Sequence, residues 1–341
     1  MARDACKLCA IWRLGGLAFC VLLPILLTAC ATAVVEATTA VINSGQVKGA
    51  KKSEFVPDLL VPWQTVTGGR LATKLDANGF PMPGAVQGFA AFISPTALAA
   101  RGADLYVADS GARKLYRVDA MAQVMSVVPG VVAMPWTQMQ VGSDLSLYVL
   151  DPQRLAIKHY TRGMQPLQTL GDPSATISLN GFVLDVPLGQ IVASDRMSQR
   201  LVMFSPLGGP ALPLIPSAVG GFKALGALAS DGRVVYAIDG ACSCVAVMGN
   251  AGQVSERIGQ GVLVQPRALA VDRHGHVFVT DAADRMLKVF LSGQLIASYS
   301  AQTLNLLEMS ALAVDEDILY VADGAGSRVI SFRIQTQIGE R

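Results

Sequence analysis

The sequence is poor in charged, aromatic and histidine side chains. Of its 341 residues, 15% are charged, 6% are aromatic and three are histidines. Residues 1–29 contain three of the 27 basic residues and one of the 25 acidic ones, so the remaining chain carries no formal net charge. Nucleic-acid-binding domains usually carry a strongly basic patch or stripe. The balance of charge therefore argues against a nucleic-acid partner.

Cysteine is also scarce beyond the N-terminal segment. Four of the six cysteines lie within the first thirty residues, which leaves Cys242 and Cys244 for the rest of the chain. Small exported domains that depend on disulfides contain many more cysteines than this. The fold is therefore not held by a disulfide framework, and its core has to come from hydrophobic residues, which make up 52% of the sequence.

The N-terminus has the three parts of an export signal. Basic residues within the first thirteen positions precede an apolar run from Leu14 to Leu27, and small residues follow that run. A membrane-spanning helix needs about 20 predominantly apolar residues, and this run is shorter and interrupted by glycine and proline. We predict that residues 1–29 are a signal peptide that is removed from the mature protein.

The cut site resembles the lipobox of bacterial lipoproteins. Residues 27–30 read LTAC, and in lipoproteins the cysteine of this motif is lipidated and becomes the first mature residue. The resemblance implies a lipid anchor on Cys30, with a plain signal peptide or a membrane helix as the alternatives. Ala31 and Thr32 follow the cysteine, and neither is an aspartate. The absence of aspartate at these positions resembles lipoproteins that are sent to the outer membrane. Residues 30–54 are then expected to be a flexible tether.

A short apolar phrase that ends in aspartate recurs through the rest of the chain. It reads LYVAD, LYVLD, IVASD, VYAID, VFVTD and LYVAD, and the copies end at Asp109, Asp151, Asp195, Asp239, Asp281 and Asp323. Successive aspartates are 42 to 44 residues apart. Regular spacing of this length is typical of a repeat architecture.

Each copy contains further short segments with β-strand character. One precedes the aspartate phrase (for example residues 310–315), one follows it (residues 328–332), and most copies have a fourth (residues 294–299). Four short antiparallel strands in a repeat of this length are the pattern of a propeller blade. We predict an all-β fold, a six-bladed β-propeller of four-stranded antiparallel blades, within residues 55–337.

The repeats resemble the NHL family of β-propellers over residues 95–335. The last copy lacks a fourth strand, so we expect an early strand at residues 63–67 to pair with it and close the ring, which leaves no open edge. Residues 68–92 are punctuated by glycine and proline and are predicted to form a long loop over one face of the domain.

An arginine follows the aspartate by three to five residues in most copies. The set is Arg113, Arg154, Arg200, Arg285 and Arg328. An arginine fork can bind carboxylate and carbonyl groups through paired hydrogen bonds. In one interpretation each arginine ties its turn to its own or a neighbouring blade. In the other, the five form a ring on one face that binds an anionic ligand. Repetition in nearly every blade favours the structural interpretation.

The fourth copy departs from this pattern. It contains Cys242 and Cys244, with Cys244 at the arginine position. Two cysteines in an exported protein can form a local disulfide, hold a soft metal or make a mixed disulfide with a partner. Two small semi-buried thiols in a turn are the remaining alternative. Zinc normally takes four ligands, so this pair alone does not make a zinc site.

No set of residues matches a familiar catalytic centre. His159 falls in a third strand away from the axis, while His274 and His276 flank a glycine in a turn that we expect to be solvated. Six-bladed enzymes such as the amidating lyases and lactonases take axial metal ligands from their inner strands, which here carry Ala-Leu-Ala. The polar residues near that level are Gln138, Gln140, Asn180 and Asp185. We therefore expect no catalytic residue, metal or cofactor.

These features predict an exported, membrane-anchored lipoprotein of the outer membrane. Its propeller would serve as a protein-binding or scaffolding module, with another envelope protein as its partner, because loops on a rigid scaffold commonly carry binding. The alternative is a metal-dependent hydrolase or lyase with a site on the ring axis. A third interpretation is the binding of a small ligand in the central channel.

Overall fold

A computed structural model describes residues 59–151, 156–171, 178–184, 189–214, 222–249 and 253–335. The predicted signal peptide, Cys30, the tether, Arg154 and Asp185 lie outside these ranges. Every regular element within them is a β-strand. No helix in this part of the chain is long and apolar enough to cross a membrane.

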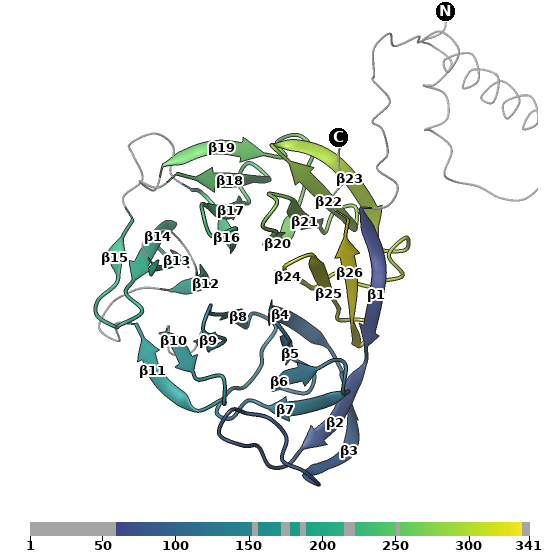
Figure 1. Ribbon diagram of the computed structural model, residues 1–341. Coiled ribbons are helices and arrows are strands. Elements are labelled where there is room, and N and C mark those ends of the chain that lie inside the picture. The colour runs from purple at the N-terminus through teal and green to yellow at the C-terminus, as the bar shows by residue number, and fades with distance from the viewer. Residues whose placement is uncertain are drawn as a thin grey trace, which may run out of the picture. The chain divides into compact units, whose positions relative to one another are not determined.

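The strands form six sheets around a central axis, and from β4 to β26 consecutive sheets around the ring follow one another in the sequence (Figure 1). We number the sheets as blades 1 to 6. Blade 1 contains β4 (Pro95–Arg101), β5 (Asp104–Asp109), β6 (Lys114–Asp119) and β7 (Val124–Val127). Blade 2 contains β8 (Gln138–Val141), β9 (Leu147–Asp151), β10 (Ala156–Tyr160) and β11 (Pro166–Leu170). Blade 3 contains β12 (Leu179–Val183), β13 (Ile191–Asp195), β14 (Arg200–Phe204) and the short β15 (Leu212–Pro213).

The second half of the ring repeats this plan. Blade 4 contains β16 (Leu225–Ser230), β17 (Val235–Asp239), β18 (Cys244–Met248) and β19 (Val254–Ile258). Blade 5 contains β20 (Pro266–Val271), β21 (Val277–Asp281), β22 (Met286–Leu291) and β23 (Gln294–Ser300). Blade 6 contains β24 (Ala311–Asp315), β25 (Ile318–Asp323) and β26 (Arg328–Ile334), with β1 (Leu60–Val66) beside β26. The prediction of an all-β, six-bladed propeller with four-stranded antiparallel blades is confirmed.

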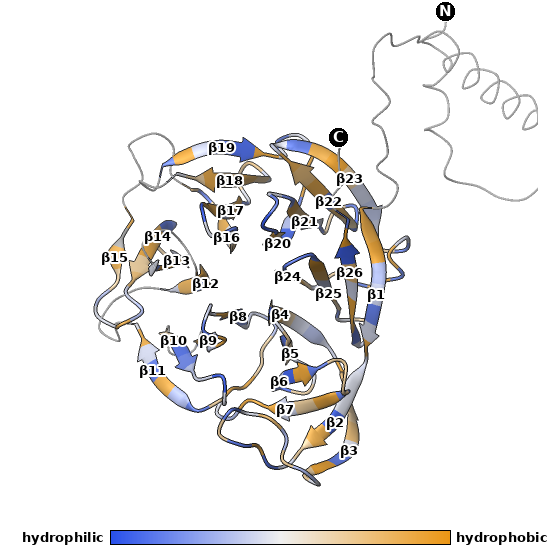
Figure 2. Ribbon diagram, viewed as in Figure 1, coloured by the Kyte–Doolittle hydropathy of each residue, from blue (hydrophilic) through white to orange (hydrophobic). Residues whose placement is uncertain are grey.

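The middle strands of each blade are buried on both sides because the neighbouring blades cover them. All five residues of β18 and of β21 are buried, for example, and the inner layers of the ribbon are largely hydrophobic (Figure 2). The buried apolar residues fall into six clusters, each shared by two adjacent blades. Fully burying one such side chain stabilises the fold by about 1.5–3 kcal/mol. The core is therefore distributed between the blades.

Blade 1 departs from the expected organisation. Strands β2 (Gly68–Ala72) and β3 (Val86–Ala91) form an antiparallel hairpin, and β2 pairs in parallel with the outer strand β7. The prediction of one long loop over residues 68–92 is therefore wrong. The open edge of β7 pairs with β2 at the start of this segment, and β3 at its end then pairs with β2.

The loop between β2 and β3, residues 73–85, packs against blades 1 and 2. Arg117 donates to Asp104 (2.6 Å) and to the carbonyl of Gly79 (2.9 Å), and Arg162 of blade 2 donates to the same Asp104 (3.0 Å). Both guanidinium groups lie over the ring of Phe80, 4.8 and 5.1 Å from its centroid. A buried carboxylate shared by two arginines explains how this polar loop packs against the ring.

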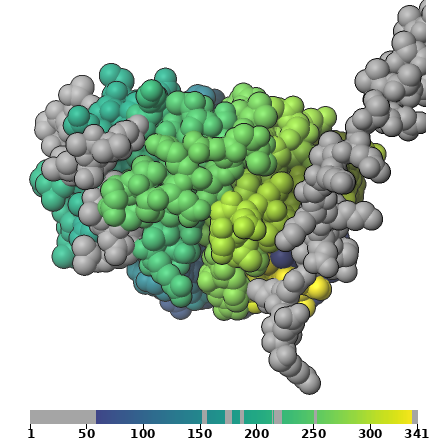
Figure 3. Space-filling model, turned by 90° about the horizontal axis from the view of Figure 1, so that it is seen from above, coloured from purple at the N-terminus to yellow at the C-terminus, as the bar shows by residue number. Residues whose placement is uncertain are grey.

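The outer strand of blade 6 comes from the N-terminal end of the domain. Strand β1 pairs antiparallel with β26, with Leu60 opposite Ile334 and Val66 opposite Val329. One of the six hydrophobic clusters joins blade 6 to blade 1 and includes Val66. In Figure 3 the surfaces of blades 4 and 5, coloured green and yellow-green, lie side by side.

The ring has two distinct faces. The second strand of each blade ends at its repeat aspartate, so the six aspartates lie on one face, together with the turns into the third strands and the blade-to-blade connections. We call this the aspartate face. The turns between first and second strands, such as residues 272–276, lie on the opposite face. Strand β1 begins opposite the end of β26, so the chain enters the domain on the opposite face.

Deletion of residues 55–67 tests the contribution of β1. The deletion exposes the edge of β26 and removes the buried side chains of Leu60 and Val66. We expect the melting temperature to fall by about 10 °C or more, since each kcal/mol corresponds to roughly 2–4 °C in a domain of this size. Deletion of residues 31–54, which keeps β1, is the matched control. An unchanged melting temperature after removal of β1 would contradict this role.

Candidate functional site on the aspartate face

The repeat aspartates bind backbone N–H groups that have no strand partner. Asp109 accepts hydrogen bonds from Ile93 (2.7 Å) and Ser94 (2.9 Å), which lead into β4, and from Ala112 (2.9 Å) in the turn after β5. Equivalent contacts on both sides are made by Asp195, Asp239, Asp281 and Asp323. An ionised carboxylate suits this position because it only accepts. The aspartates therefore join two loops of their own blade.

These hydrogen bonds control the ionisation of the carboxylates. Asp281 is buried and accepts from Val264 N (2.8 Å) and from Lys288 Nζ (2.8 Å). Burial alone would raise the pKa of Asp281, but the bonds from Lys288 and the backbone outweigh it and lower the pKa below its usual value. At Asp195 burial is likewise outweighed, here by the Ser198 hydroxyl and backbone N–H groups, and the pKa is lowered.

The cation that pairs with the aspartate comes from different strands in different blades. Arg328 lies at the start of β26, 2.9 Å from Asp323. In blades 2 and 5 the partner is Lys158 or Lys288, the third residue of the third strand. In blade 4 it is Arg257 from the outer strand β19. The signal in the sequence for the two lysines was their spacing, seven residues after the aspartate.

The predicted arginine set occupies two different positions. Arg113 and Arg285 end the turn after the second strand, with positive φ angles of 57° and 58°. Arg200 and Arg328 instead begin β14 and β26, directly opposite the aspartate in the strand pairing. Cys244 matches this second position in blade 4. The five residues are therefore not one equivalent ring.

The members of the set also differ in what they contact. Arg285 donates to the carbonyl of Leu307 (2.6 Å), and Arg328 donates to the carbonyl of Asn305, both in the connection from blade 5 to blade 6. Arg113 and Arg200 have exposed side chains on the aspartate face. Of the described members, these two are therefore the ones available to an anionic ligand.

Three of the segments that lead into an inner strand on this face are held by hydrogen bonds from two blades. The N–H groups of Ile93, Val264 and Leu307 donate to the aspartate of their own blade. Their carbonyl groups accept hydrogen bonds from the preceding blade, donated by Ser327 (2.7 Å), Ser243 (2.8 Å) and Arg285 (2.6 Å) respectively. The backbone is held while the side chains point outward, and they are 58%, 64% and 57% exposed.

A fourth large apolar side chain continues this series. Trp136 lies in the connection from blade 1 to blade 2 and is 53% exposed. With Val264, Leu307 and Ile93 it gives one exposed apolar residue on the aspartate face at the start of blades 5, 6, 1 and 2, which are consecutive around the ring. We call these four residues the apolar arc. The repetition of an exposed apolar residue at the start of four consecutive blades makes this part of the face a candidate interaction site.

A cavity of about 680 Å³ opens beside the arc. Its wall includes Leu307 of the arc and the charged side chains of Arg267 and Glu308. Thr96, at the start of the inner strand of blade 1, also lines it, and its buried Oγ1 has no hydrogen-bond partner. The cavity therefore offers apolar contacts together with a cation and an anion.

The mouth of the channel on the opposite face is a second cavity, of about 530 Å³, lined by all six blades. It contains Gln140 from the predicted polar group, together with Arg101 and Asp315. Burial, and then the charge of Glu316, raise the pKa of Asp315. Asn180 instead donates to the carbonyl of Leu225 (3.3 Å) and so links blades 3 and 4.

The three histidines are separated from the aspartate face. His159 lies in β10, as expected, and stacks on Tyr148 with 4.0 Å between ring centroids. His274 is exposed and lies 3.1 Å from Asp317. His276 is buried, with its Nδ1 2.6 Å from the Asp272 carboxylate, so the expectation of a solvated turn is wrong for this residue. No three His, Cys, Asp or Glu residues of the described chain are grouped as metal ligands.

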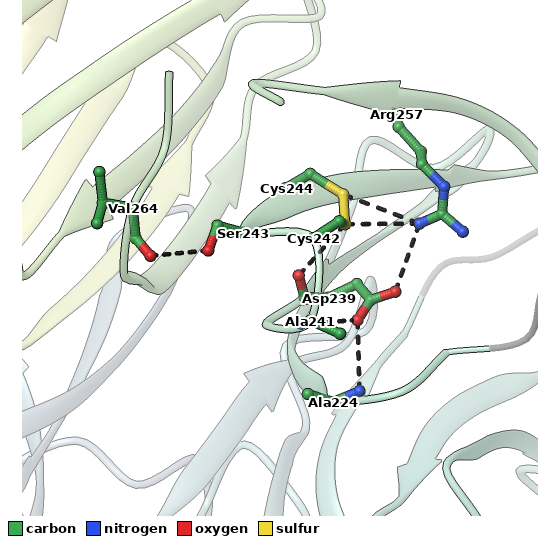
Figure 4. Close-up of a disulfide and its surroundings, with 8 residues drawn as sticks. All are labelled: Ala224, Asp239, Ala241, Cys242, Ser243, Cys244, Arg257 and Val264. Carbon is green, nitrogen blue, oxygen red and sulfur yellow. Dashed lines mark hydrogen bonds and ion pairs between the residues drawn. A yellow bond between two sulfur atoms is a disulfide. The ribbon is translucent and has the colours of Figure 1, made fainter. Parts of the chain in front are cut away.

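Cys242 and Cys244 are joined by a disulfide in the turn between β17 and β18 (Figure 4). Their Cα atoms are 5.2 Å apart, within the usual range for a disulfide. The guanidinium of Arg257 lies 3.6 Å from one sulfur and 3.8 Å from the other, and 3.4 Å from the Asp239 carboxylate. The Ser243 hydroxyl, between the two cysteines, reaches the carbonyl of Val264 in the apolar arc.

Solved structures with this fold include enzymes and a protein of unknown function. Virginiamycin B lyase from Staphylococcus aureus is 11% identical, with a TM-score of 0.51 over 72% of this chain and 86% of the other. A gluconolactonase from Xanthomonas campestris is 16% identical, with a TM-score of 0.54 over 80% and 98%. A protein of unknown function from Bacteroides thetaiotaomicron is 13% identical, with a TM-score of 0.56 over 80% and 76%.

At these identities the similarity shows a shared six-bladed propeller fold and nothing about activity. No protein-family model and no curated protein matches the sequence.

The substitution Asp281→Asn tests the role of the repeat aspartates. It removes the negative charge that pairs with Lys288 and replaces one of the two acceptor oxygens with an NH2 group that faces N–H donors, so we expect a loss of about 3–5 kcal/mol at pH 7. Asp284→Asn is the matched control, because Asp284 pairs with the same lysine but is 41% exposed. It should cost about 1 kcal/mol or less. Urea unfolding measures both variants.

The pH dependence of this difference follows from the lowered pKa of Asp281. The folded-state pKa lies below the unfolded value of 3.8, so the stabilisation is fully present above that value. It is lost as pH falls through the folded-state pKa. The gap between the native protein and Asp281→Asn should therefore narrow below about pH 4. A gap that persists unchanged in acid would contradict the assignment.

Proposed function

We propose that the protein is a lipid-anchored envelope protein whose propeller binds another protein through the apolar arc on its aspartate face. The proposal rests on the exposed side chains of Ile93, Val264 and Leu307, whose backbone groups are held by hydrogen bonds. Three consecutive blades use the same backbone hydrogen bonds to present a large apolar side chain to solvent. Nothing in the stability of the ring requires those side chains to be apolar, because their backbone makes the contacts.

The rigidity of the arc supports binding rather than a passive surface. The segments that carry Ile93, Val264 and Leu307 are each held through both an N–H and a C=O group, so little conformational entropy is lost there when a partner docks. Arg113 and Arg267 are exposed on the same face and provide cations near the apolar residues. Apolar anchors surrounded by polar and charged groups are the usual composition of a protein interface.

The position at which the chain enters the propeller supports the aspartate face as the binding face. Leu60 begins β1 on the opposite face, where it pairs with Ile334. The point at which β1 begins therefore does not cover the arc. A partner in the periplasm or at the cell surface would bind at the aspartate face.

A second candidate is an enzyme with a site at the ring axis, as in the alternative of a metal-dependent hydrolase or lyase. The cavity beside Arg267, Glu308 and Thr96 is the observation that favours it. Metal analysis of the protein purified as Cys30→Ser separates the two candidates. A stoichiometric Ca²⁺ or Zn²⁺ that is lost on substitution of Glu308 would favour the enzyme.

The substitution Leu307→Asp tests binding through the arc. We expect the affinity for the co-purifying envelope protein to fall roughly five- to thirtyfold, and its recovery from solubilised membranes to fall with it, since loss of one buried anchor costs roughly 1–2 kcal/mol. Leu207→Asp is the matched control, because Leu207 is 93% exposed in a turn between the outer strands of blade 3. Equal recovery with both variants, at equal melting temperature, would contradict binding through the arc.

The anchor is tested by replacing Cys30. The variant Cys30→Ser should move from the membrane fraction to the soluble fraction, because the predicted lipid is the sole anchor in this proposal. Fractionation followed by mass measurement of the N-terminal peptide follows both the location and the lipid. Cys20→Ser, which changes a cysteine within the predicted signal peptide, is the control and should remain membrane-bound.

A further inference from the structure

The turn that contains the disulfide has the same backbone as turns that have none. Ser243, between the two cysteines, has a positive φ of 48°. The equivalent residues of four other blades have φ angles of 53° to 58°, namely Arg113 (57°), Gln199 (54°), Arg285 (58°) and Ser327 (53°). Those four blades form this turn without a cross-link. The disulfide is therefore not required to form the turn.

A cross-link over so short a loop also contributes little to the stability of the fold. The stabilisation from a disulfide grows with the length of the chain segment it closes, and this one spans only Cys242 to Cys244. The fold of blade 4 already has the aspartate contacts of the other blades, including Asp239 with Ala224 and Ala241. The turn of blade 4 therefore has its stabilising aspartate contacts without the disulfide.

The surroundings of the sulfurs favour a thiolate. Arg257 lies within 3.6 and 3.8 Å of the two Sγ atoms, and it comes from the outer strand rather than from the position used in blade 6. Its side chain is 27% exposed and pairs with Asp239 at 3.4 Å, so one guanidinium serves a carboxylate and both sulfurs. A nearby arginine stabilises the thiolate form of cysteine.

The two sulfurs differ in access. Cys244 is completely buried at the start of β18, whereas Cys242 is partly exposed in the turn. An attacking thiol can therefore reach Cys242 more readily, and Cys244 is the sulfur that would leave. Attack by a thiolate on the accessible sulfur, with a stabilised thiolate as leaving group, is the geometry that thiol–disulfide exchange requires.

We propose that the Cys242–Cys244 disulfide is a thiol–disulfide exchange site whose substrate is a thiol. The thiolate of the substrate attacks Sγ of Cys242, the Cys242–Cys244 bond breaks, and Cys244 leaves as a thiolate beside Arg257. The product is a mixed disulfide between the substrate and Cys242. A second substrate thiolate then attacks the substrate sulfur and releases Cys242, so two thiols are oxidised to a disulfide and the protein becomes a dithiol.

The position of the disulfide bears on the source of the thiol. Ser243 is hydrogen-bonded to Val264, so the exchange site lies at one end of the apolar arc (Figure 4). A small thiol and a cysteine of a bound polypeptide share the same chemistry. Two probes distinguish them, glutathione and a peptide that contains one cysteine flanked by leucine and valine. Faster reaction of the peptide at equal thiolate concentration identifies a polypeptide substrate, and equal rates identify a small thiol.

The first experiment measures reduction of the full-length protein in detergent by glutathione, with alkylation and peptide mapping of Cys242 and Cys244. We expect reduction within minutes without loss of the fold. Arg257→Gln should slow reduction roughly five- to tenfold, because Cys244 becomes a poorer leaving group. Arg257→Lys, which keeps the charge, should stay within about twofold. Arg233→Gln, an exposed arginine on the opposite face of the same blade, is the matched control and should not change the rate.

A disulfide that opens only in denaturant would overturn the proposal, as would equal rates for Arg257→Gln and Arg233→Gln. A second pair of variants does not depend on Arg257. With oxidised glutathione, Cys244→Ser should form a mixed disulfide at Cys242 at least tenfold faster than Cys242→Ser does at Cys244. Equal rates would contradict attack at Cys242. The double variant Cys242→Ser/Cys244→Ser should keep its melting temperature within a few degrees, and a large fall would show that the disulfide is structural.

Discussion

The propeller depends on a carboxylate at the end of the second strand, which in five of the six blades accepts hydrogen bonds from the backbone N–H groups of two loops. At Asp109 these are Ile93, Ser94 and Ala112, all within 2.9 Å. The loops that lead into a blade cannot use the sheet to satisfy their N–H groups, and leaving such groups buried without partners is costly. A single aspartate at the end of the second strand solves this problem for both loops. The same residue therefore recurs at the same position around the ring.

This arrangement also determines which parts of the chain are free to differ. Where the backbone of a segment is held by the aspartate and by the preceding blade, its side chains are not needed to hold the segment in place. The side chains of Ile93, Val264 and Leu307 are exposed and apolar. Blade 4 differs, because Arg257 from the outer strand supplies the cation and the usual position is left to Cys244. The sites proposed for this protein lie where a common backbone carries uncommon side chains.

The sequence predicted the periodic features well and the non-local ones poorly. The aspartate spacing located the blades, because each aspartate ends a buried strand whose apolar pattern is visible locally. The hairpin of β2 and β3 was missed because its stability comes from the edge of β7, some fifty residues away. The role of Arg257 was missed for a similar reason, since its carboxylate partner lies eighteen residues earlier on a different strand. The burial of His276 depended on Asp272, whose contact follows only from the geometry of the turn.

The sequence by itself determined the number of blades, the order of strands and the position of the repeated aspartates, since these follow from local periodicity and hydrogen-bonding capacity. The predictions of an export signal and of a lipidated cysteine also rest on the sequence by itself, because both motifs are contiguous patterns. Only the tertiary structure decided which arginines occupy equivalent positions, which apolar side chains remain exposed and which cation faces the two sulfurs. Those properties depend on pairing register and on contacts between neighbouring blades, and no local pattern encodes them.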